Sequence, residues 1–123
     1  MRIKILSEDA LFSRWIRKRD GKCMRCGSKV GYNPDGEPIT HQNSHYWGRR
    51  NWGVRFDPEN CDTLCFYCHQ QWGGDYRRDY EAFKRKQLGE ISYRNLEIRK
   101  NMYCKRDRKL AMIFVRALIQ TNK

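Results

Sequence analysis

The sequence has little negative charge and no long apolar segment. Of its 123 residues, 26 are Lys or Arg and only 14 are Asp or Glu. No apolar run approaches the roughly 18 residues that a membrane-spanning helix needs. Residues 1–11 lack the apolar core of a secretory signal peptide. Internal repeats and low-complexity tracts are also absent, so we expect one small globular unit with no membrane partner.

Positive charge is abundant, and it is unevenly distributed. The formal net charge is +12, and residues 92–123 carry +7 of that excess. A balance this basic in a short chain favours a polyanionic partner, and nucleic acid above all. Within this segment we expect Arg106, Arg108 and Lys109 to contact the DNA backbone. A solvated helix surface is the alternative interpretation.

Turn and capping signals predict an α+β fold with flanking helices. Ser7 is a predicted N-cap, and Gly21 ends the first helix. Short strands are predicted at residues 39–46 and 53–56, with a helix from Cys65 to about Trp72. Asp75 is predicted to cap a further helix that ends at Gly89.

Ser92 is predicted to cap the C-terminal segment, which is predicted to form one helix or two. Apolar residues recur in it at helical spacing, which predicts a stripe that packs on the domain or on a second subunit: Leu110, Ile113, Phe114, Ala117 and Leu118. We therefore divide the chain into a domain over residues 1–91 and a basic helical extension over residues 92–123.

Two CxxC pairs predict a structural zinc site. Cys23 and Cys26 form the first pair, Cys65 and Cys68 the second, and 38 residues separate the pairs. Four thiolates at this spacing bind Zn²⁺ tetrahedrally, and a turn followed by a helix start is typical of a treble-clef zinc finger. Cys61 is a weaker alternative ligand.

Three polar residues between and after these pairs resemble the HNH, or ββα-metal, nucleases. They are His45, Asn60 fifteen residues later, and His69 nine residues after that. Neutral imidazole accepts a proton near pH 7, so His45 is the predicted general base. His69 is the predicted ligand of a catalytic divalent cation, Mg²⁺ or Mn²⁺. Asn60 either ligates this cation or holds the His45 loop.

A narrower resemblance is carried by Asn43-Ser44-His45-Tyr46, by Arg49-Arg50 and by the run from Arg55 to Asn60. These residues resemble the NinG (Rap) recombination endonucleases of lambda-like phages, over roughly residues 20–97. The resemblance implies a phage-encoded nuclease, in the cytoplasm of a bacterial host, that cuts branched DNA such as Holliday junctions and D-loops. Cutting both strands of a symmetric junction makes a homodimer plausible.

The chain departs from these patterns at two positions. Ser44 stands where many HNH enzymes have a metal-binding Asp or His, and His41, Asp57 or Asp75 are candidates to replace that ligand. His69 stands where NinG-type sequences often have Asn.

Basic and aromatic side chains surround the predicted site. Arg49, Arg50 and Arg55 are predicted to clamp phosphates, with a solvated loop face as the alternative. Trp47, Trp52 and Trp72 either stack on unpaired bases or cover a small core.

A second function class also fits part of the pattern. A non-catalytic zinc-stabilised module that binds nucleic acid would account for the charge and the cysteines. It would leave the spacing of His45, Asn60 and His69 unexplained, and we therefore prefer the endonuclease.

Overall fold

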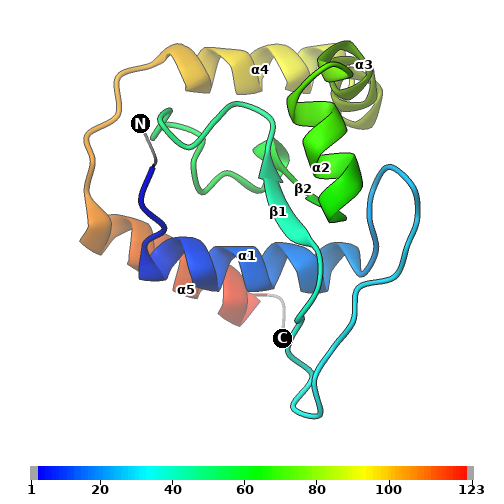
Figure 1. Ribbon diagram of the computed structural model, residues 1–123. Helices are drawn as coiled ribbons and strands as arrows, with labels where there is room; N and C mark the ends of the chain where they lie inside the picture. Colours follow the sequence, from blue (N-terminus) through cyan, green and yellow to red (C-terminus); the bar gives the residue numbers. More distant parts are fainter. Residues whose placement is uncertain (1–2, 122–123) are drawn as a thin grey trace.

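Five helices surround a two-stranded sheet in the computed structural model, which describes residues 3–121. In Figure 1, α1 and α5 run side by side at one end, α3 and α4 lie at the other, and β1, β2 and α2 lie between them. The elements, in chain order, are α1 (Ser7–Asp20), β1 (Gln42–His45), a 3₁₀ turn (Pro58–Asn60), β2 (Cys61–Leu64), α2 (Phe66–Gly73), α3 (Arg77–Leu88), α4 (Glu90–Asn101) and α5 (Arg108–Thr121). The predicted α+β class is confirmed.

The sheet pairs β1 with β2 in antiparallel register, with His45 opposite Cys61. The predicted second strand at residues 53–56 is wrong. Those residues form turns instead, in which the Val54 N–H bonds to the Asn51 carbonyl and the Asp57 N–H to the Val54 carbonyl. Gly53 also lies so close to α4 that a Cβ would sit 2.4 Å from the Arg99 carbonyl oxygen. The strand forms later, where β2 is buried along its whole length.

Helix α1 begins and ends close to where the sequence predicts. Its C-cap is Gly21 at φ 68°, and the Gly21 N–H bonds to the Arg17 carbonyl, as a left-handed cap requires. Ser7 is the first helical residue rather than the N-cap, which is Leu6. The capping acceptor comes instead from Asp9, whose carboxylate accepts the Leu6 N–H at 2.8 Å.

The two helices after the Gly73-Gly74 break also start at residues other than the predicted caps. Tyr76 precedes α3 and Gly89 precedes α4, so neither Asp75 nor Ser92 is an N-cap. Helix α4 spans the predicted boundary at residue 91, and its Tyr93 belongs to the same core cluster as Tyr46 and Trp72. Residues 1, 2, 122 and 123 of the two predicted ranges lie outside the described part of the chain.

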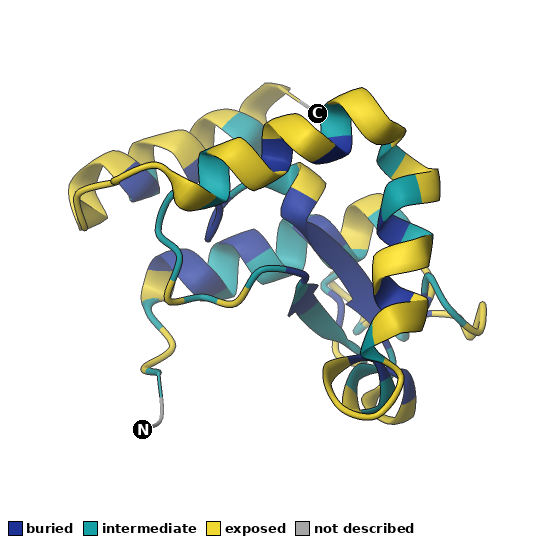
Figure 2. Ribbon diagram, turned by 90° about the horizontal axis from the view of Figure 1, so that it is seen from above, coloured by how far each residue is buried: buried dark blue, intermediate teal, exposed yellow. Residues whose placement is uncertain are grey.

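The C-terminal segment forms two helices, and α5 packs along α1. The face that packs differs in part from the predicted stripe. Ala111 and Val115 are buried and Leu118 packs against the same core cluster, whereas Leu110, Ile113, Phe114 and Ala117 are exposed. Figure 2 shows this division as buried bands on the inner side of the helix. Residues 102–107 separate α4 from α5 and form no helix. No helix among residues 3–121 is long and apolar enough to cross a membrane.

A buried ion pair joins α3 to the sheet. Lys84 Nζ lies 2.7 Å from the Asp62 carboxylate, and both side chains are fully buried. The Tyr80 hydroxyl donates a hydrogen bond to the same carboxylate at 2.9 Å, and its oxygen accepts one from Ser44 Oγ at 3.2 Å. Ser44 thus points into the core, away from its neighbour His45, as alternation along a strand requires.

Replacing Lys84 by Met is expected to destabilise the fold by about 3–5 kcal/mol, because Asp62 would be left charged and buried without its partner. Chemical denaturation measures the change in the free energy of unfolding. Lys86→Met, at an exposed position two residues away, is the matched control and should change it by less than about 0.5 kcal/mol. Equal effects of the two variants would contradict the role assigned to Lys84.

Candidate metal centre and histidine pocket

The four cysteines of the two CxxC pairs meet in space. The Sγ atoms of Cys23, Cys26, Cys65 and Cys68 all lie within 4.8 Å of one another, and those of Cys26 and Cys65 are 3.9 Å apart. Four Zn–S bonds of about 2.3 Å in a tetrahedron place the sulfurs about 3.8 Å apart. The cluster is therefore compatible with a structural zinc ion. Among residues 3–121 it is the only group of three or more His, Cys, Asp or Glu side chains whose ligand atoms lie close enough together to hold one metal ion.

Local backbone structure prepares each pair for a metal. In the first pair, the Cys26 N–H points at Cys23 Sγ, and in the second the Cys68 N–H points at Cys65 Sγ, both at 3.5 Å. Such N–H···S bonds favour thiolates, which are the metal-binding form. Hydrogen bonding with Ser28 lowers the pKa of Cys26 to about 6. The second pair opens α2, with Cys65 as its N-cap. Cys61 is not one of the four clustered cysteines. It is fully buried in a second core cluster, together with Phe12, Ile16 and Phe56.

All three histidines of the chain line one open pocket of about 600 Å³, which we call the histidine pocket. His45 is the last residue of β1, His41 directly precedes that strand, and His69 comes from α2. One wall is α1, which contributes Arg14 and Arg17, and Arg49 lies on the loop after β1. The pocket thus combines imidazoles with guanidinium groups.

His45 is held in one tautomer by the backbone. Its Nε2 lies 2.9 Å from the carbonyl oxygen of Arg55. A carbonyl only accepts, so Nε2 carries the proton and Nδ1 keeps the lone pair. Burial lowers the pKa of His45 to about 4, although this hydrogen bond favours the charged ring and opposes the shift. The imidazole is therefore neutral at pH 7, with the lone pair on Nδ1.

Asn60 supports the loop that follows His45. It is fully buried, and its Oδ1 accepts the Trp47 N–H at 2.9 Å. Its Nδ2 donates to the carbonyls of Trp47 and Val54 at 2.9 and 3.1 Å. Asn60 does not line the histidine pocket, so these bonds favour the loop-holding role over the predicted role as a ligand of the catalytic cation.

His69 and Arg49 lie close enough to interact. Burial lowers the pKa of His69, and the positive charge of Arg49 lowers it further. Arg49 also lowers the pKa of His45, and all three residues line the same pocket. The Oδ1 atom of Asn43 is buried and has no hydrogen-bond partner. Imidazole nitrogens and amide oxygens are both ligands of divalent cations, and His69 and Asn43 both line the pocket.

Two of the predicted DNA contacts are committed elsewhere. Arg55 is 3% exposed, and its guanidinium binds Asp9 at 2.6 and 3.0 Å. This burial leaves Arg55 little surface with which to reach DNA, so Arg49 and Arg50 are the better candidates for the predicted phosphate contact. The sequence does not show that Asp9 folds against Arg55. Arg108 binds the buried carboxylate of Glu8 with two 2.8 Å bonds. Arg50, Arg106 and Lys109 are exposed.

His41, Asp57 and Asp75 are the candidates to replace the metal ligand that Ser44 does not supply. Asp57 caps the 3₁₀ turn and pairs with Arg99 at 2.7 Å. Neither Asp57 nor Asp75 lines the histidine pocket. His41 does, but its ring bonds to Ser28 and Thr40. It sits at φ 68°, the one positive φ outside glycine among the described residues.

The predicted tryptophans mainly cover the core. Trp72 is buried and stacks on Tyr80 with ring centroids 4.5 Å apart. Trp47 is half-buried against Tyr46, and Trp52 against Phe56. Sequence reasoning missed Arg14 and Arg17 as pocket residues. Arg14 and Arg17 are three residues apart on the predicted helix, which indicates that they share a basic face. The sequence does not show that this face meets β1.

Searches with models of protein families, among curated proteins and among solved structures found no match for this chain.

Replacing Cys65 by Ser should unfold the protein rather than merely inactivate it. Structural zinc contributes on the order of 10 kcal/mol to the folding of small domains, and one lost thiolate weakens that binding strongly. Zinc content and circular dichroism are the measurements. Cys104→Ser, at an exposed cysteine outside the cluster, is the control and should keep both at wild-type values. A folded, zinc-free Cys65→Ser protein would refute the zinc site.

Proposed function

We propose that this protein is a zinc-stabilised, metal-dependent DNA endonuclease of the HNH type. The observation that carries the proposal is His45, a neutral imidazole with a fixed tautomer in an open, basic pocket that also contains His69. These residues come from β1 and α2, which contact each other and β2 beside the cysteine cluster, and this packing supports the proposal.

The chemistry follows from the roles of the side chains. Phosphodiester hydrolysis needs a water molecule that loses a proton as it attacks phosphorus. In the proposed reaction His45 Nδ1 takes that proton, while the Arg55 carbonyl holds the opposite ring nitrogen and stabilises the imidazolium that results. Asn60 fixes the loop in which this carbonyl lies.

Charge on the phosphate also needs stabilisation. Arg49 lies near both His45 and His69 and is suited to bind the scissile phosphate. A divalent cation, Mg²⁺ or Mn²⁺, would be held by His69, with Asn43 Oδ1 as a second protein ligand. It would supply Lewis-acid stabilisation of the phosphate and of the leaving 3′ oxygen.

The partner class follows from charge. The net charge of +12 and the exposed Arg50, Arg106 and Lys109 support electrostatic binding to the DNA backbone. The NinG-like residues support branched recombination intermediates as substrates. The exposed face of α5, with Leu110, Ile113 and Phe114, is suited to a homodimer contact.

Removing the base should abolish cleavage without removing DNA binding. We expect His45→Ala to cut a four-way junction and a linear duplex about 10²–10⁴-fold more slowly than the wild type with Mg²⁺ or Mn²⁺, the usual effect of losing a general base. Cleavage under single-turnover conditions and binding by fluorescence anisotropy are the two measurements.

His41→Asn is the matched control, because His41 lines the same pocket but its ring bonds to Ser28 and Thr40. Asn tolerates a positive φ, so this variant should fold and cut at nearly the wild-type rate. Near wild-type cutting by His45→Ala would sink the assignment. Binding without any cutting by the wild type would instead favour the non-catalytic module.

A further inference from the structure

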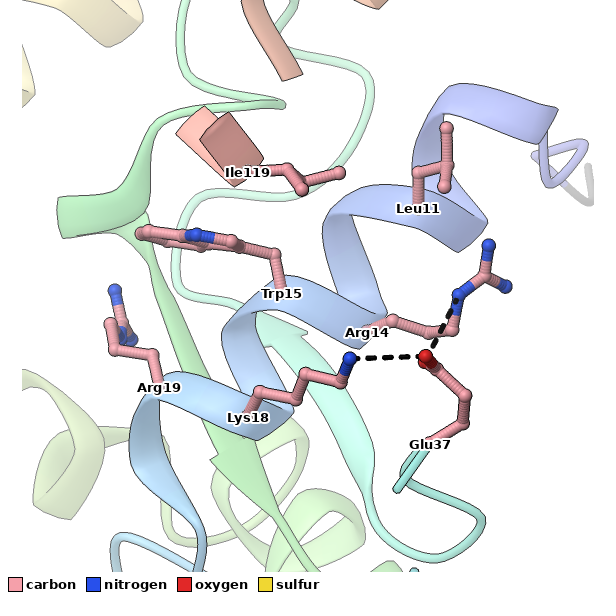
Figure 3. A pocket seen from close by; sticks show the side chains of 7 residues that line it. All are labelled: Leu11, Arg14, Trp15, Lys18, Arg19, Glu37 and Ile119. Carbon is pink, nitrogen blue, oxygen red and sulfur yellow. Dashed lines mark hydrogen bonds and ion pairs between the residues drawn. The ribbon is translucent and has the colours of Figure 1, made fainter. Parts of the chain in front are cut away.

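A second pocket, of about 560 Å³, lies on the opposite flank of α1, between that helix and the end of α5. Its apolar wall is formed by Leu11, Trp15 and Ile119, and its cationic wall by Arg14 and Lys18. Figure 3 shows the Trp15 ring beside Ile119, and its dashed lines mark the contacts of Arg14 and Lys18 with Glu37. We call this the Trp15 pocket. Its volume lies within the range of about 300–1,000 Å³ that is typical of ligand sites.

The cations of this pocket are weakly engaged. Lys18 Nζ lies 3.1 Å from the Glu37 carboxylate, and Arg14 Nε lies 3.8 Å from it. All three side chains are between 41% and 47% exposed. Ion pairs at such exposed positions contribute about 0–1 kcal/mol, so a phosphate can replace the carboxylate at little cost. Arg19, in contrast, is tied to Asp20 and to the carbonyls of Pro58 and Cys61.

The Trp15 pocket is connected to the histidine pocket along α1. Arg14 lines both pockets. Arg17 lines the histidine pocket, where its guanidinium donates to the carbonyls of Pro38 and Thr40, and Lys18 lines the Trp15 pocket. The three basic residues form one ridge around the helix at 3.6 residues per turn, in which Arg14 and Lys18 are the weakly engaged members. A nucleic-acid backbone that leaves the histidine pocket over this ridge reaches Trp15.

We propose that the Trp15 pocket binds an unpaired nucleotide of the DNA strand, with its phosphate on Arg14 and Lys18 and its base against Trp15, Leu11 and Ile119. This proposal rests on the proposed function for its ligand, DNA, and it names the part of the substrate that is recognised.

The chemistry of the pocket selects an unpaired nucleotide. A paired base has both faces covered by its neighbours in the duplex, and only an unpaired base is able to enter an apolar pocket beside a tryptophan. The adjoining cations meet the phosphate that every nucleotide carries. A branch, a flap or a gap in a recombination intermediate supplies such nucleotides, whereas an intact duplex does not.

Two neutralising substitutions with opposite expected effects test the proposal. The ligands are a duplex with a single-stranded tail and the same duplex without it, and binding is measured by fluorescence anisotropy on zinc-loaded protein without added Mg²⁺ or Mn²⁺. Lys18→Gln should weaken binding of the tailed duplex several-fold and lower its salt slope by about 0.7, the value for one phosphate contact on a single strand. Glu37→Gln removes the competing carboxylate and should tighten binding of the tailed duplex.

Neither variant should change binding of the untailed duplex. Lys86→Gln carries the same charge change at an exposed position on α3 and controls for net charge. Equal weakening of both ligands by Lys18→Gln, an unchanged affinity for the tailed duplex, or weaker binding by Glu37→Gln would each overturn the proposal. These measurements need no cleavage, so they test the pocket separately from the nuclease. If the wild-type protein cuts no DNA but prefers the tailed duplex, and Lys18→Gln removes that preference, the proposed nuclease activity is refuted and the proposed role of the Trp15 pocket is supported.

Discussion

Arg55 holds three parts of the protein together through its side chain and its backbone carbonyl. The guanidinium binds Asp9 at the start of α1, and it also donates to the carbonyls of Lys4 and Arg49. The carbonyl of the same residue accepts the hydrogen bond from His45. Burial alone would raise the pKa of Asp9, but the bonds from Arg55 and from the Leu6 N–H lower it overall. The pair therefore stays charged, and it fixes α1 and the loop around the imidazole.

The cysteine cluster holds the other side of the pocket in place. The first CxxC turn follows α1 directly, and the second CxxC pair begins α2, from which His69 projects. A metal bound to all four sulfurs would fix α2, and with it His69, relative to β1 and His45. The two core clusters are small, so a metal at this position would supply rigidity that a chain of this size does not gain from apolar burial alone.

Local signals in the sequence predicted what local geometry decides. The end of α1 at Gly21 and the start of α2 each depend on a few neighbouring residues. The meeting of the two CxxC pairs is a long-range contact, and it was predicted from the four-thiolate spacing that one zinc ion requires. The second strand was misplaced because residues 53–56 alternate as a strand does, while the close approach of Gly53 to Arg99 depends on a helix more than forty residues later. The role of Arg55 was missed for the same reason, since its partner Asp9 is 46 residues away.

The inward face of α5 is another feature that the local sequence does not determine. Two apolar stripes fit its periodicity, one through Ala111 and Val115 and one through Leu110 and Phe114. The first is buried because small side chains allow α5 to approach α1 closely, and because Arg108 is drawn to Glu8 on that helix. Periodicity alone identifies an amphipathic helix, but it does not choose between neighbouring faces.

The most direct test of the central claim is whether the zinc-loaded wild-type protein breaks phosphodiester bonds in DNA. Supercoiled plasmid is incubated with the protein and Mg²⁺ or Mn²⁺, and conversion to nicked circles is followed on a gel. The account predicts nicking that stops when the added cation is chelated and resumes when it is restored. A protein that binds the plasmid but leaves it supercoiled with either cation would contradict the account.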